Sequence, residues 1–391
     1  MAFFIDFFVK LCYLNILLFD NKNKIYIRET DMGKKVWDGW SGGVRTFPSC
    51  DDFTAGFSTA HYFNGHPAQI ELADSLNKLL KGASVALTTR GMTAIEAVLF
   101  AFAQNGQQIA CSQDIYPGTR NLLLELEEGE LIKVVWFDPS DLNQVALAAA
   151  SSAIVFTETI GNARMMRVAD IPAMAKICWN EMALLVVDTT FTPLYPVPDN
   201  SNVVVVSSLT KYHQIGEDLM GGIISSVDQG VIDKIRATQF FKNHQMLPSI
   251  AVRFLRPILH LFKMRHTHIC ANALKLAEVC EGHSSVNQVW YPGLKSHQQH
   301  SLVDEIYGGY AGGVLYCQLK GGEEAVIKLA DTLAAANNWK IAVSYGGEFW
   351  RILPFIGLLA RNDGQGLVRL ASDWKDPLLA LAAFTEALNS L

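Results

Sequence analysis

The stretch "VVVVSSLTKYHQIGEDLMGG", from Val203 to Gly222, decides the fold class of this chain. Four consecutive valines are typical of a strand that is buried on both faces, as strands are in a parallel sheet covered by helices. The run ends in two serines, and Lys211 follows shortly after. A lysine at the end of a buried strand is partly desolvated, which lowers its pKa and makes its amine nucleophilic. Taken alone, such a residue is usually a loop lysine at the surface.

Short apolar runs alternate with amphipathic ones on both sides of this stretch. From about residue 83 we expect strands in "ASVALTT", "QIACS", "LIKVVWF", "SAIVFTE" and "MALLVVD", and helices in "GMTAIEAVLFAFAQ", "YPGTRNLLLELEE" and "ADIPAMAKICWNE". This alternation predicts an α/β fold with a mostly parallel central sheet. A long helical region from about Pro248 then leads into a smaller C-terminal α/β domain that contains "GVLYCQL", "KIAVSY" and "LVRLAS".

Composition limits the classes of function. The chain has 391 residues, of which 50% are hydrophobic and 18% charged, which suits a large two-domain protein or one that buries surface in an oligomer. The net charge is −6 and no long basic run occurs, so nucleic acid is not an expected partner. Seven scattered cysteines without a CxxC motif argue against disulfides and zinc, and favour a reducing, cytoplasmic compartment. The segment "HLFKMRHTH" is interpreted as an exposed helix face, so no metal site is expected.

The N-terminal stretch "MAFFIDFFVKLCYLNILLF" is apolar, but Asp6 and Lys10 interrupt it. Its longest uncharged part, Leu11–Phe19, has nine residues, which is too short to span a bilayer. It also lacks the basic start and the cleavage site of a signal peptide. We interpret it as an extension that packs on the body or on a partner, or as an upstream false start with Met32 as the true one. Membrane association is the less favoured alternative.

Ligands of such sheets bind at the carboxyl ends of the strands. Asp188 ends "LLVVD", and a carboxylate there can pair with a pyridinium nitrogen. A lysine such as Lys211 can hold an aldehyde cofactor as a Schiff base. The hydroxyls of Ser208 and Thr210, which flank Lys211, can then bind a phosphate carried by that cofactor. Taken singly, Asp188 is more often a cap or turn residue.

Two further strands are followed by groups that can bind a cofactor. The backbone N–H groups of Gly91 and Met92, at a predicted helix start, can bind phosphate oxygens. The ring of Tyr116 can stack on a planar cofactor. Arg369, inside the apolar "LVRLA", needs a buried anion, either a substrate carboxylate or a structural ion-pair partner.

Seven segments occur in the order typical of one enzyme family: "RGMTAIEAVL", "DIYPGT", "ETIGN", "VVDTTFTP", "SSLTKY…DLMGG", "YPGLKSHQQH" and "LVRLAS". They resemble the cystathionine γ-synthase-like enzymes, which use pyridoxal phosphate in cysteine and methionine metabolism. The resemblance runs from about residue 56 to the C-terminus. It implies fold type I, with an extension 1–55, a large cofactor domain 56–247 and a small domain 248–391. It also implies a homo-oligomer, usually a tetramer built from dimers that share active sites.

The resemblance also implies roles for individual residues. Lys211 matches the lysine that forms the Schiff base with the cofactor, and Asp188 matches the partner of the pyridine nitrogen. Tyr116 matches the aromatic residue that stacks on the cofactor ring, and Asn162 matches the asparagine near the ring hydroxyl. The residues that match phosphate binders are Gly91, Met92, Ser208 and Thr210. Arg369 and Ser344 match residues that contact the substrate carboxylate.

Four departures from the family pattern concern the phosphate site and the substrate side. His61 and Phe63 stand where the family has a Tyr-x-Arg pair that binds the neighbouring subunit's cofactor phosphate. Arg90 replaces a common serine, and we hypothesise that it supplies the missing positive charge. In the third departure, Thr189 stands in place of an asparagine and the following proline comes one residue early. In the fourth, Glu348 directly follows the two glycines, where the family has one further residue before its glutamate. Phe349 and Trp350 are expected to make this part of the substrate pocket bulkier and more apolar.

The activity implied is elimination or replacement on a sulfur-containing or homoserine-derived amino acid, with γ chemistry favoured over β. Lys211 would act as the general base for the α-proton. Two alternatives remain. One is a degenerate member that serves as an oligomer partner, as the lost Tyr-x-Arg pair suggests. The other is an aminotransferase on the same fold.

Overall fold

The computed structural model describes residues 66–81, 84–355 and 366–391, and the backbone of four short strands nearer the N-terminus. The chain divides into two compact units, Met1–Asn64 and Gly65–Leu391. The first unit contains two antiparallel pairs, β1 (Leu18–Phe19) with β2 (Ile25–Tyr26) and β3 (Lys35–Trp37) with β4 (Val44–Thr46). The rest of the expected N-terminal extension lies outside the described residues.

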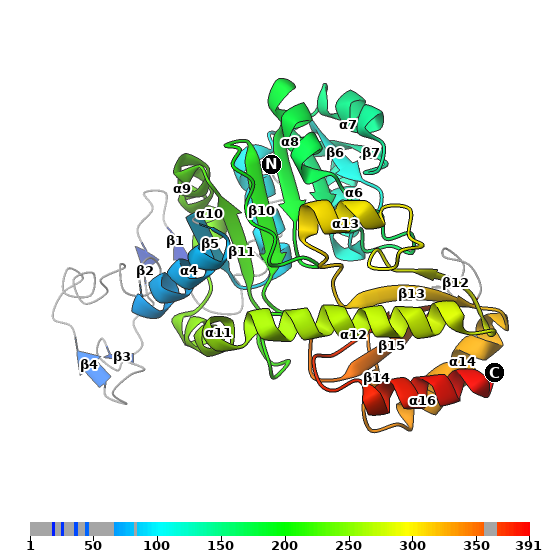
Figure 1. The fold of residues 1–391 in the computed structure, drawn as a ribbon. Helices are drawn as coiled ribbons and strands as arrows, with labels where there is room; N and C mark the ends of the chain where they lie inside the picture. Colours follow the sequence, from blue (N-terminus) through cyan, green and yellow to red (C-terminus); the bar gives the residue numbers. More distant parts are fainter. Residues whose placement is uncertain are drawn as a thin grey trace. The chain divides into compact units, whose positions relative to one another are not determined.

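A seven-stranded sheet forms the centre of the second unit (Figure 1). Its strands, in spatial order, are β5 (Ser84–Thr88), β11 (Gly222–Ser226), β10 (Val203–Ser208), β9 (Leu184–Asp188), β8 (Ile154–Glu158), β6 (Gln107–Ser112) and β7 (Ile132–Phe137). The five strands from β10 to β7 are parallel, whereas β11 pairs antiparallel with both of its neighbours. The expected α/β fold with a mostly parallel sheet is confirmed.

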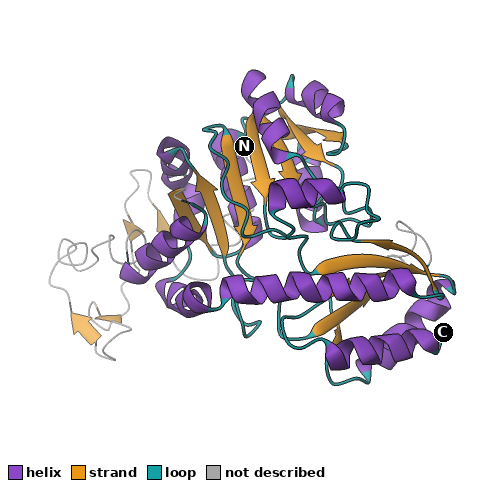
Figure 2. Cartoon of the chain, in the orientation of Figure 1, coloured by secondary structure: helices purple, strands orange, loops and turns teal. Residues whose placement is uncertain are grey.

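Helices cover both faces of this sheet, as Figure 2 shows in purple around the orange strands. The helices of one face are α5 (Gly91–Phe102), α6 (Pro117–Glu128), α9 (Gln229–Ala237) and α10 (Gln239–Asn243), and those of the other are α4 (Pro67–Leu79), α7 (Leu142–Ala149) and α8 (Ile171–Asn180). In β10, Val204 and Val206 pack into the first apolar layer, and Val203 and Val205 pack into the second. Because both faces of β10 are buried, its sequence is an unbroken run of valines rather than an alternation of apolar and polar residues.

Local sequence fixes where several of these helices begin. The carboxylate of Asp170 accepts a hydrogen bond from the backbone N–H of Ala173 at 3.0 Å and so caps α8. Asp141 caps α7 in the same way, and Pro117 opens α6. Acidic caps and first-turn prolines satisfy or remove N–H groups that have no partner within the helix. These starts place the loops that follow β6, β7 and β8 at one edge of the sheet.

The C-terminal part contains a second, five-stranded sheet. Its strands, in spatial order, are β12 (Val286–Trp290), β13 (Val314–Leu319), β16 (Leu367–Ala371), β15 (Trp350–Pro354) and β14 (Trp339–Ile341). Only β14 and β15 are parallel to each other. The helices α13 (His300–Tyr307), α14 (Gly322–Ala334) and α16 (Leu378–Asn389) also belong to this part of the chain, and α13 lies beside the large sheet (Figure 1). The boundaries expected after residues 55 and 247 remain predictions, because Gly65–Leu391 forms one compact unit.

The long helical region contains α11 (Pro248–His260) and α12 (Phe262–Gly282), which meet at Leu261. Figure 1 shows α12 running along the second sheet, and it packs on β12 and β13. The prediction that "HLFKMRHTH" is an exposed face is wrong for three residues, because Phe262, Arg265 and His266 are buried. Arg265 donates hydrogen bonds to the carbonyl oxygens of Tyr212 and Gln214, contacts that residue spacing alone does not reveal.

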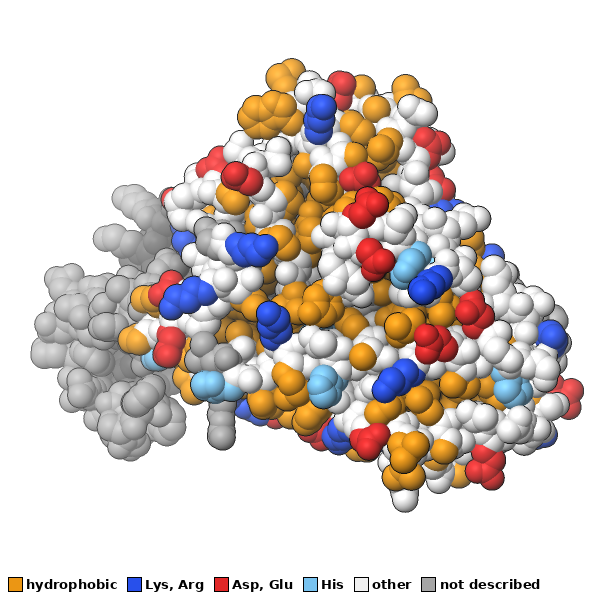
Figure 3. All heavy atoms as spheres, in the orientation of Figure 1, with side chains coloured by type: hydrophobic (Ala, Val, Ile, Leu, Met, Phe, Trp, Pro, Cys, Tyr) orange, Lys and Arg blue, Asp and Glu red, His pale blue; other side chains and the backbone are white. Residues whose placement is uncertain are grey.

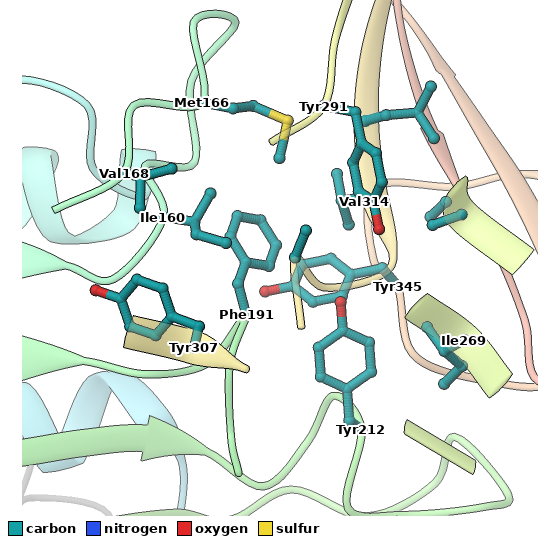
Figure 4. Packing of buried hydrophobic residues seen from close by; sticks show 14 of the residues in the cluster. Ile160, Met166, Val168, Phe191, Tyr212, Ile269, Tyr291, Tyr307, Val314 and Tyr345 are labelled. Atoms are coloured by element: carbon teal, nitrogen blue, oxygen red, sulfur yellow. The ribbon is translucent and has the colours of Figure 1, made fainter. Parts of the chain in front are cut away.

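A group of buried aromatic rings packs beside the end of β10. The ring centre of Tyr345 lies 5.1 Å from that of Phe191 and 5.4 Å from that of Tyr212 (Figure 4). The hydroxyl of Tyr212 accepts a hydrogen bond from the backbone N–H of Gly313 at 2.8 Å, next to β13. The rings therefore join the loop that carries Lys211 to segments of the second sheet.

Several features are absent from the described part of the chain. None of its helices is both long and apolar enough to cross a membrane. No group of three His, Cys, Asp or Glu side chains in those residues could hold a metal ion. The cysteines found there are buried free thiols, namely Cys111, Cys178, Cys270, Cys280 and Cys317. On the face seen in Figure 3, acidic and basic side chains are interspersed.

Candidate active site

The parallel strands β8, β9 and β10 bring polar residues to one edge of the large sheet. Asp188, the last residue of β9, is in register with Glu158, the last residue of β8, and with Val206 of β10. Lys211 follows three residues after β10 ends. Because the strands run in the same direction, the predicted lysine and the predicted carboxylate emerge at the same edge.

The amine of Lys211 is held between a hydroxyl and an aromatic ring. Its Nζ atom donates a hydrogen bond to Oγ of Ser344 at 3.0 Å and lies 5.0 Å from the centre of the Tyr345 ring. Burial, followed by the positive charges of Arg369 and Arg351, lowers the pKa of Lys211 to about 8. A larger share of this amine is therefore unprotonated near neutral pH than in an exposed lysine.

Two carboxylates, buried Glu158 and half-buried Asp188, lie side by side at the strand ends. Asp188 accepts hydrogen bonds from the backbone N–H of Thr190 at 2.8 Å and from its hydroxyl at 2.5 Å, yet burial raises the pKa of Asp188 to about 6. Burial and the neighbouring charge of Asp188 raise the pKa of Glu158 well above its ordinary value. Two adjacent carboxylates with little access to water resist ionising together, so this edge favours a cationic group next to them.

Glu158 is the site residue that the sequence analysis did not assign. Its carboxylate accepts hydrogen bonds from the backbone N–H groups of Tyr116 at 2.6 Å and Asn162 at 2.9 Å. It thereby fixes the positions of two residues that were predicted to contact a cofactor. The available signal was its place as the last residue of the strand "IVFTE".

The start of α5 packs directly against the end of β10. A Cβ atom on Gly91 would lie 2.7 Å from Cβ of Ser208, so only glycine allows this approach. The first N–H groups of α5, which include those of Gly91 and Met92, have no partner within the helix. The structure thus brings these three predicted phosphate-binding residues together.

Thr210, the fourth predicted phosphate binder, has its hydroxyl engaged within the protein. Its Oγ1 atom accepts a hydrogen bond from the backbone N–H of Gly221 at 3.3 Å. The sulfur of Met92 is 3.9 Å from the hydroxyl of Thr119. These contacts engage the side chains of Thr210 and Met92, and the backbone N–H groups of Gly91 and Met92 are the available donors at the helix start.

Tyr116 and Asn162 flank the carboxylate of Glu158. The Tyr116 side chain is 43% exposed and its ring covers Gly118, where a Cβ atom would lie 2.4 Å from the ring. A ring held in this way presents a free face to a planar ligand. The side-chain oxygen of buried Asn162 accepts a hydrogen bond from the hydroxyl of Tyr316 at 3.4 Å, so it is tied to β13.

Arg369 lies in β16 with its side chain buried, opposite Tyr316 and Leu353 of the adjacent strands. Its guanidinium donates a hydrogen bond to the carbonyl oxygen of Val343. No carboxylate of the described residues forms an ion pair with it, so the structural ion pair considered for Arg369 is not found in this part of the chain. A buried guanidinium without an anion is costly, which marks this place as suited to a carboxylate.

The sequence departures have different outcomes. His61 and Phe63 lie outside the described residues. Arg90 is exposed, and its Nε atom is 3.3 Å from the hydroxyl of Thr93. Thr189 is buried, and its hydroxyl has no hydrogen-bond partner among the described residues.

The aromatic pair after Glu348 does not form the wall that the sequence analysis expected. Trp350 packs against Trp339 at 5.5 Å between ring centres, because alternate residues of β15 face opposite sides of the sheet. Phe349 lies against the ammonium of Lys340, 3.3 Å from its ring centre. Both rings are therefore packed within the C-terminal sheet region.

Comparisons with known proteins agree with this geometry. The model of the family described as Cys/Met metabolism PLP-dependent enzyme matches residues 46–349. Cystathionine gamma-synthase 1, chloroplastic, of Arabidopsis thaliana is 30% identical over 289 residues, which are 72% of this chain and 50% of that protein. Canavanine gamma-lyase of Pseudomonas canavaninivorans is 29% identical over 334 residues, which are 81% of this chain and 82% of the lyase.

A solved structure shares the fold. The crystal structure of cystathionine gamma synthase from Xanthomonas oryzae pv. oryzae in complex with cystathionine has a TM-score of 0.75 and 26% sequence identity, and the match covers 90% of each chain. The chain spans about half the length of the plant relatives that it matches.

Proposed function

Because the chain belongs to the Cys/Met metabolism family of PLP-dependent enzymes, we propose that it binds pyridoxal phosphate at the edge described above and acts on an amino acid. The reaction proposed is elimination or replacement at the γ-carbon of a sulfur-containing or homoserine-derived substrate. The observation that carries the proposal is Lys211. Its half-buried amine has a lowered pKa and lies at the same sheet edge as Asp188.

The residues present fit the cofactor. The close approach of Gly91 to Ser208 leaves a cradle of backbone N–H groups at the start of α5, which suits a phosphate. The adjacent carboxylates of Asp188 and Glu158 suit a protonated ring nitrogen. We propose that Asp188 pairs with that nitrogen and that Lys211 attaches the cofactor covalently.

The remaining predicted residues would complete the site. We propose that Tyr116 covers the cofactor ring, that Asn162 lies near the ring hydroxyl, and that the phosphate is held by Gly91, Met92, Ser208 and Thr210. The fixed positions of Tyr116 and Asn162, both bonded through their backbone to Glu158, support these assignments. Arg369 would hold the substrate carboxylate by two parallel hydrogen bonds, with Ser344 beside it.

When bound, the cofactor takes up the electron pair released at the substrate α-carbon. The protein supplies the proton transfers. Nζ of Lys211, unprotonated in an appreciable fraction of molecules, would remove the α-proton. For departure of a γ-substituent, the same atom can also move a proton from the β-carbon. Arg369, fixed on β16, would keep the α-carbon within reach of Lys211.

Two observations favour γ over β chemistry. Among eight curated relatives, seven, including the plant synthase and the bacterial lyase, are named for reactions at the γ-carbon, and one, from Neurospora crassa, is a cystathionine beta-lyase that is 30% identical to this chain. The solved neighbour is a cystathionine gamma synthase in complex with cystathionine. Cystathionine and homoserine esters are therefore the first substrates to examine.

We also propose a cytoplasmic homo-oligomer. The free thiols of the described cysteines are compatible with a reducing compartment. The low charged fraction of 18% suits a chain that buries part of its surface against copies of itself. Light scattering of the purified protein would measure the subunit number.

The experiment that tests the proposed reaction is a product assay with pyridoxal phosphate present. Cystathionine and O-acylhomoserine are offered with and without cysteine, and keto acid, ammonia and thioether are measured. Keto acid released together with ammonia indicates elimination, and a thiol-dependent thioether indicates replacement. Keto acid without ammonia would indicate an aminotransferase. Absence of any product difference between wild type and Lys211→Ala would contradict the proposal.

A further inference from the structure

An ion pair joins the loop after Lys211 to the C-terminal sheet. Oε1 of Glu217 lies 2.5 Å from Nη2 of Arg351 and also accepts a hydrogen bond from the backbone N–H of Glu348 at 2.7 Å. The side chain of Arg351 is 4% exposed and that of Glu217 is 32% exposed. Glu217 adopts the left-handed backbone conformation, with φ of +59°, which is uncommon for a residue with a side chain. The carboxylate of Glu217 thus interacts with two donors, the guanidinium of Arg351 and the backbone N–H of Glu348.

The two segments fit together closely at several points. A Cβ atom on Gly346 would lie 2.7 Å from the carbonyl carbon of Lys211. A Cβ atom on Gly347 would lie 1.8 Å from Oε1 of Glu217, so the carboxylate occupies the space above this glycine. The turn that carries Ser344 therefore packs directly on the loop that carries Lys211, and Glu217 of that loop packs against Gly347 of the turn.

The register of the sheet places Arg351 on the side that faces Lys211. Leu353 of β15 is opposite Arg369 of β16, and Arg351 is two residues before Leu353, so both arginines lie on the same face. Diagonal neighbours of this kind are about 7–8 Å apart. Both guanidiniums act on the charge of Lys211. Arg369 lacks an ion-pair partner in the described part of the chain, whereas Arg351 has Glu217.

We infer that Glu217 and Arg351 form a positioning pair, which seats the Ser344 turn against Lys211 and sets the positive charge beside the Lys211 amine. The inference rests on the proposed function of Lys211. It adds two residues that the family resemblance did not assign. Neither residue needs to touch the substrate, because the pair acts through Lys211 and Ser344.

The charge of the pair matters because few other groups among the described residues face the amine. Lys211 faces Arg369 from β16, Arg351 from β15 and Tyr345 from the turn, while Asp188 and Glu158 interact with Tyr345 from the large sheet. Loss of Arg351 removes one cation, and loss of the Glu217 charge leaves that cation without its counter-ion. The two changes should therefore shift the titration of Lys211 in opposite directions.

The test measures how readily Lys211 is acetylated by acetic anhydride as a function of pH in the cofactor-free full-length protein, with peptide mass spectrometry as the readout. Arg351→Met should move the midpoint up by roughly 0.5–1 pH unit, and Glu217→Gln should move it down. Arg351→Lys, which retains a cation, should lie between Arg351→Met and wild type. The matched control is Asp218→Asn, which neutralises the next acidic residue, part of an exposed pair with Arg253, and should leave the midpoint in place.

A merely structural role gives a different result. If the pair only holds the fold, both substitutions loosen the site and both midpoints rise toward that of an exposed lysine. That result, or two unchanged midpoints, would overturn the inference. Should Glu217→Gln fail to fold, the double variant Glu217→Gln/Arg351→Met removes both charges and should fold better than Glu217→Gln alone. Its midpoint should match that of wild type more closely than that of Arg351→Met.

Failure of the proposed function gives a separate outcome. If Lys211 of the wild type is acetylated like an exposed lysine, the assignment of Lys211 is wrong and the inference falls with it. If wild-type Lys211 titrates low and the variants do not move it, only the positioning pair is refuted.

Discussion

The amine of Lys211 donates a hydrogen bond to the hydroxyl of Ser344 at 3.0 Å, across 133 residues of sequence. Lys211 belongs to the loop after β10 of the large sheet, and Ser344 belongs to the turn between β14 and β15 of the second sheet. The contact shows that the proposed catalytic group is oriented from both sheets at once. Changes in either sheet region should therefore affect the chemistry at Lys211.

Ser344→Ala tests this orientation. The substitution removes the acceptor of a hydrogen bond from a charged group, which is worth about 1.5–3 kcal/mol, so we expect kcat/KM to fall roughly 10- to 100-fold. The cofactor absorption should persist, because Ser344 is not assigned to cofactor binding. Ser296→Ala, which removes a hydroxyl bonded to exposed Glu281, is the control and should retain full activity. Equal kcat/KM for both variants would argue against a role for Ser344.

Gly91→Ala tests the proposed phosphate cradle. The added methyl would lie 2.7 Å from Cβ of Ser208, so either the start of α5 or the end of β10 must shift. We expect the free energy of unfolding to fall by about 1–3 kcal/mol and the affinity for pyridoxal phosphate to decrease. Urea unfolding and equilibrium dialysis of the cofactor provide the two measurements.

Gly282→Ala is the matched control for this substitution. No atom lies within 4 Å of a Cβ placed on Gly282, at the end of α12. The change should be neutral or slightly stabilising. Cofactor affinity that falls as much in Gly282→Ala as in Gly91→Ala would speak against the cradle.

Arg90→Ala tests whether this arginine supplies charge to the cofactor phosphate. Arg90 is exposed and directly precedes Gly91, and it forms no ion pair within the described part of the chain. Loss of a partly exposed charge-assisted contact should weaken cofactor binding by roughly 3- to 30-fold. Lys133→Ala removes an exposed positive charge from β7 and should leave affinity unchanged. An unchanged dissociation constant for Arg90→Ala would sink the hypothesis.

Asp373→Asn tests the pH dependence of stability outside the site. Burial raises the pKa of Asp373 to about 6, while its carboxylate still accepts a hydrogen bond from the backbone N–H of Lys375 at 2.9 Å. A raised pKa means that the protonated form favours the folded state. The stabilisation is complete below about pH 4 and is lost as the pH rises through about 6.

The asparagine variant stays neutral at every pH, so its stability relative to wild type should rise by about 1–2 kcal/mol between pH 4 and pH 7. Urea unfolding at several pH values gives this difference directly. Asp376→Asn, at an exposed carboxylate that accepts from Leu378, serves as the control and should show no such trend. A difference for Asp373→Asn that does not change with pH would refute the expectation.

The sequence predicted those features that depend on local pattern. The valine run of β10, the carboxylate at the end of β9 and the glycine at the start of α5 all follow from strand and helix periodicity, and the fold class is confirmed. Glu158 escaped assignment because its importance comes from accepting two backbone N–H groups, 42 and 4 residues away. The sequence shows a strand end there, but not what surrounds it.

Long-range contacts account for the other differences. Arg265 has the spacing of an exposed helix position, yet it is buried because the loop carbonyl oxygens of Tyr212 and Gln214 require donors. Trp350 is next to the proposed pocket in sequence, but the alternation of β15 turns it toward Trp339. The Glu217–Arg351 pair joins two segments whose proximity only the assembled sheets reveal.

The most direct test of the account is the visible absorption of the purified protein with pyridoxal phosphate, for wild type and Lys211→Ala, followed by borohydride reduction and peptide mass spectrometry. The account predicts an absorption band of covalently bound cofactor in wild type, absent from Lys211→Ala, and a pyridoxyl phosphate adduct on the peptide that contains Lys211. A band that survives in Lys211→Ala, or an adduct on a different lysine, would contradict it.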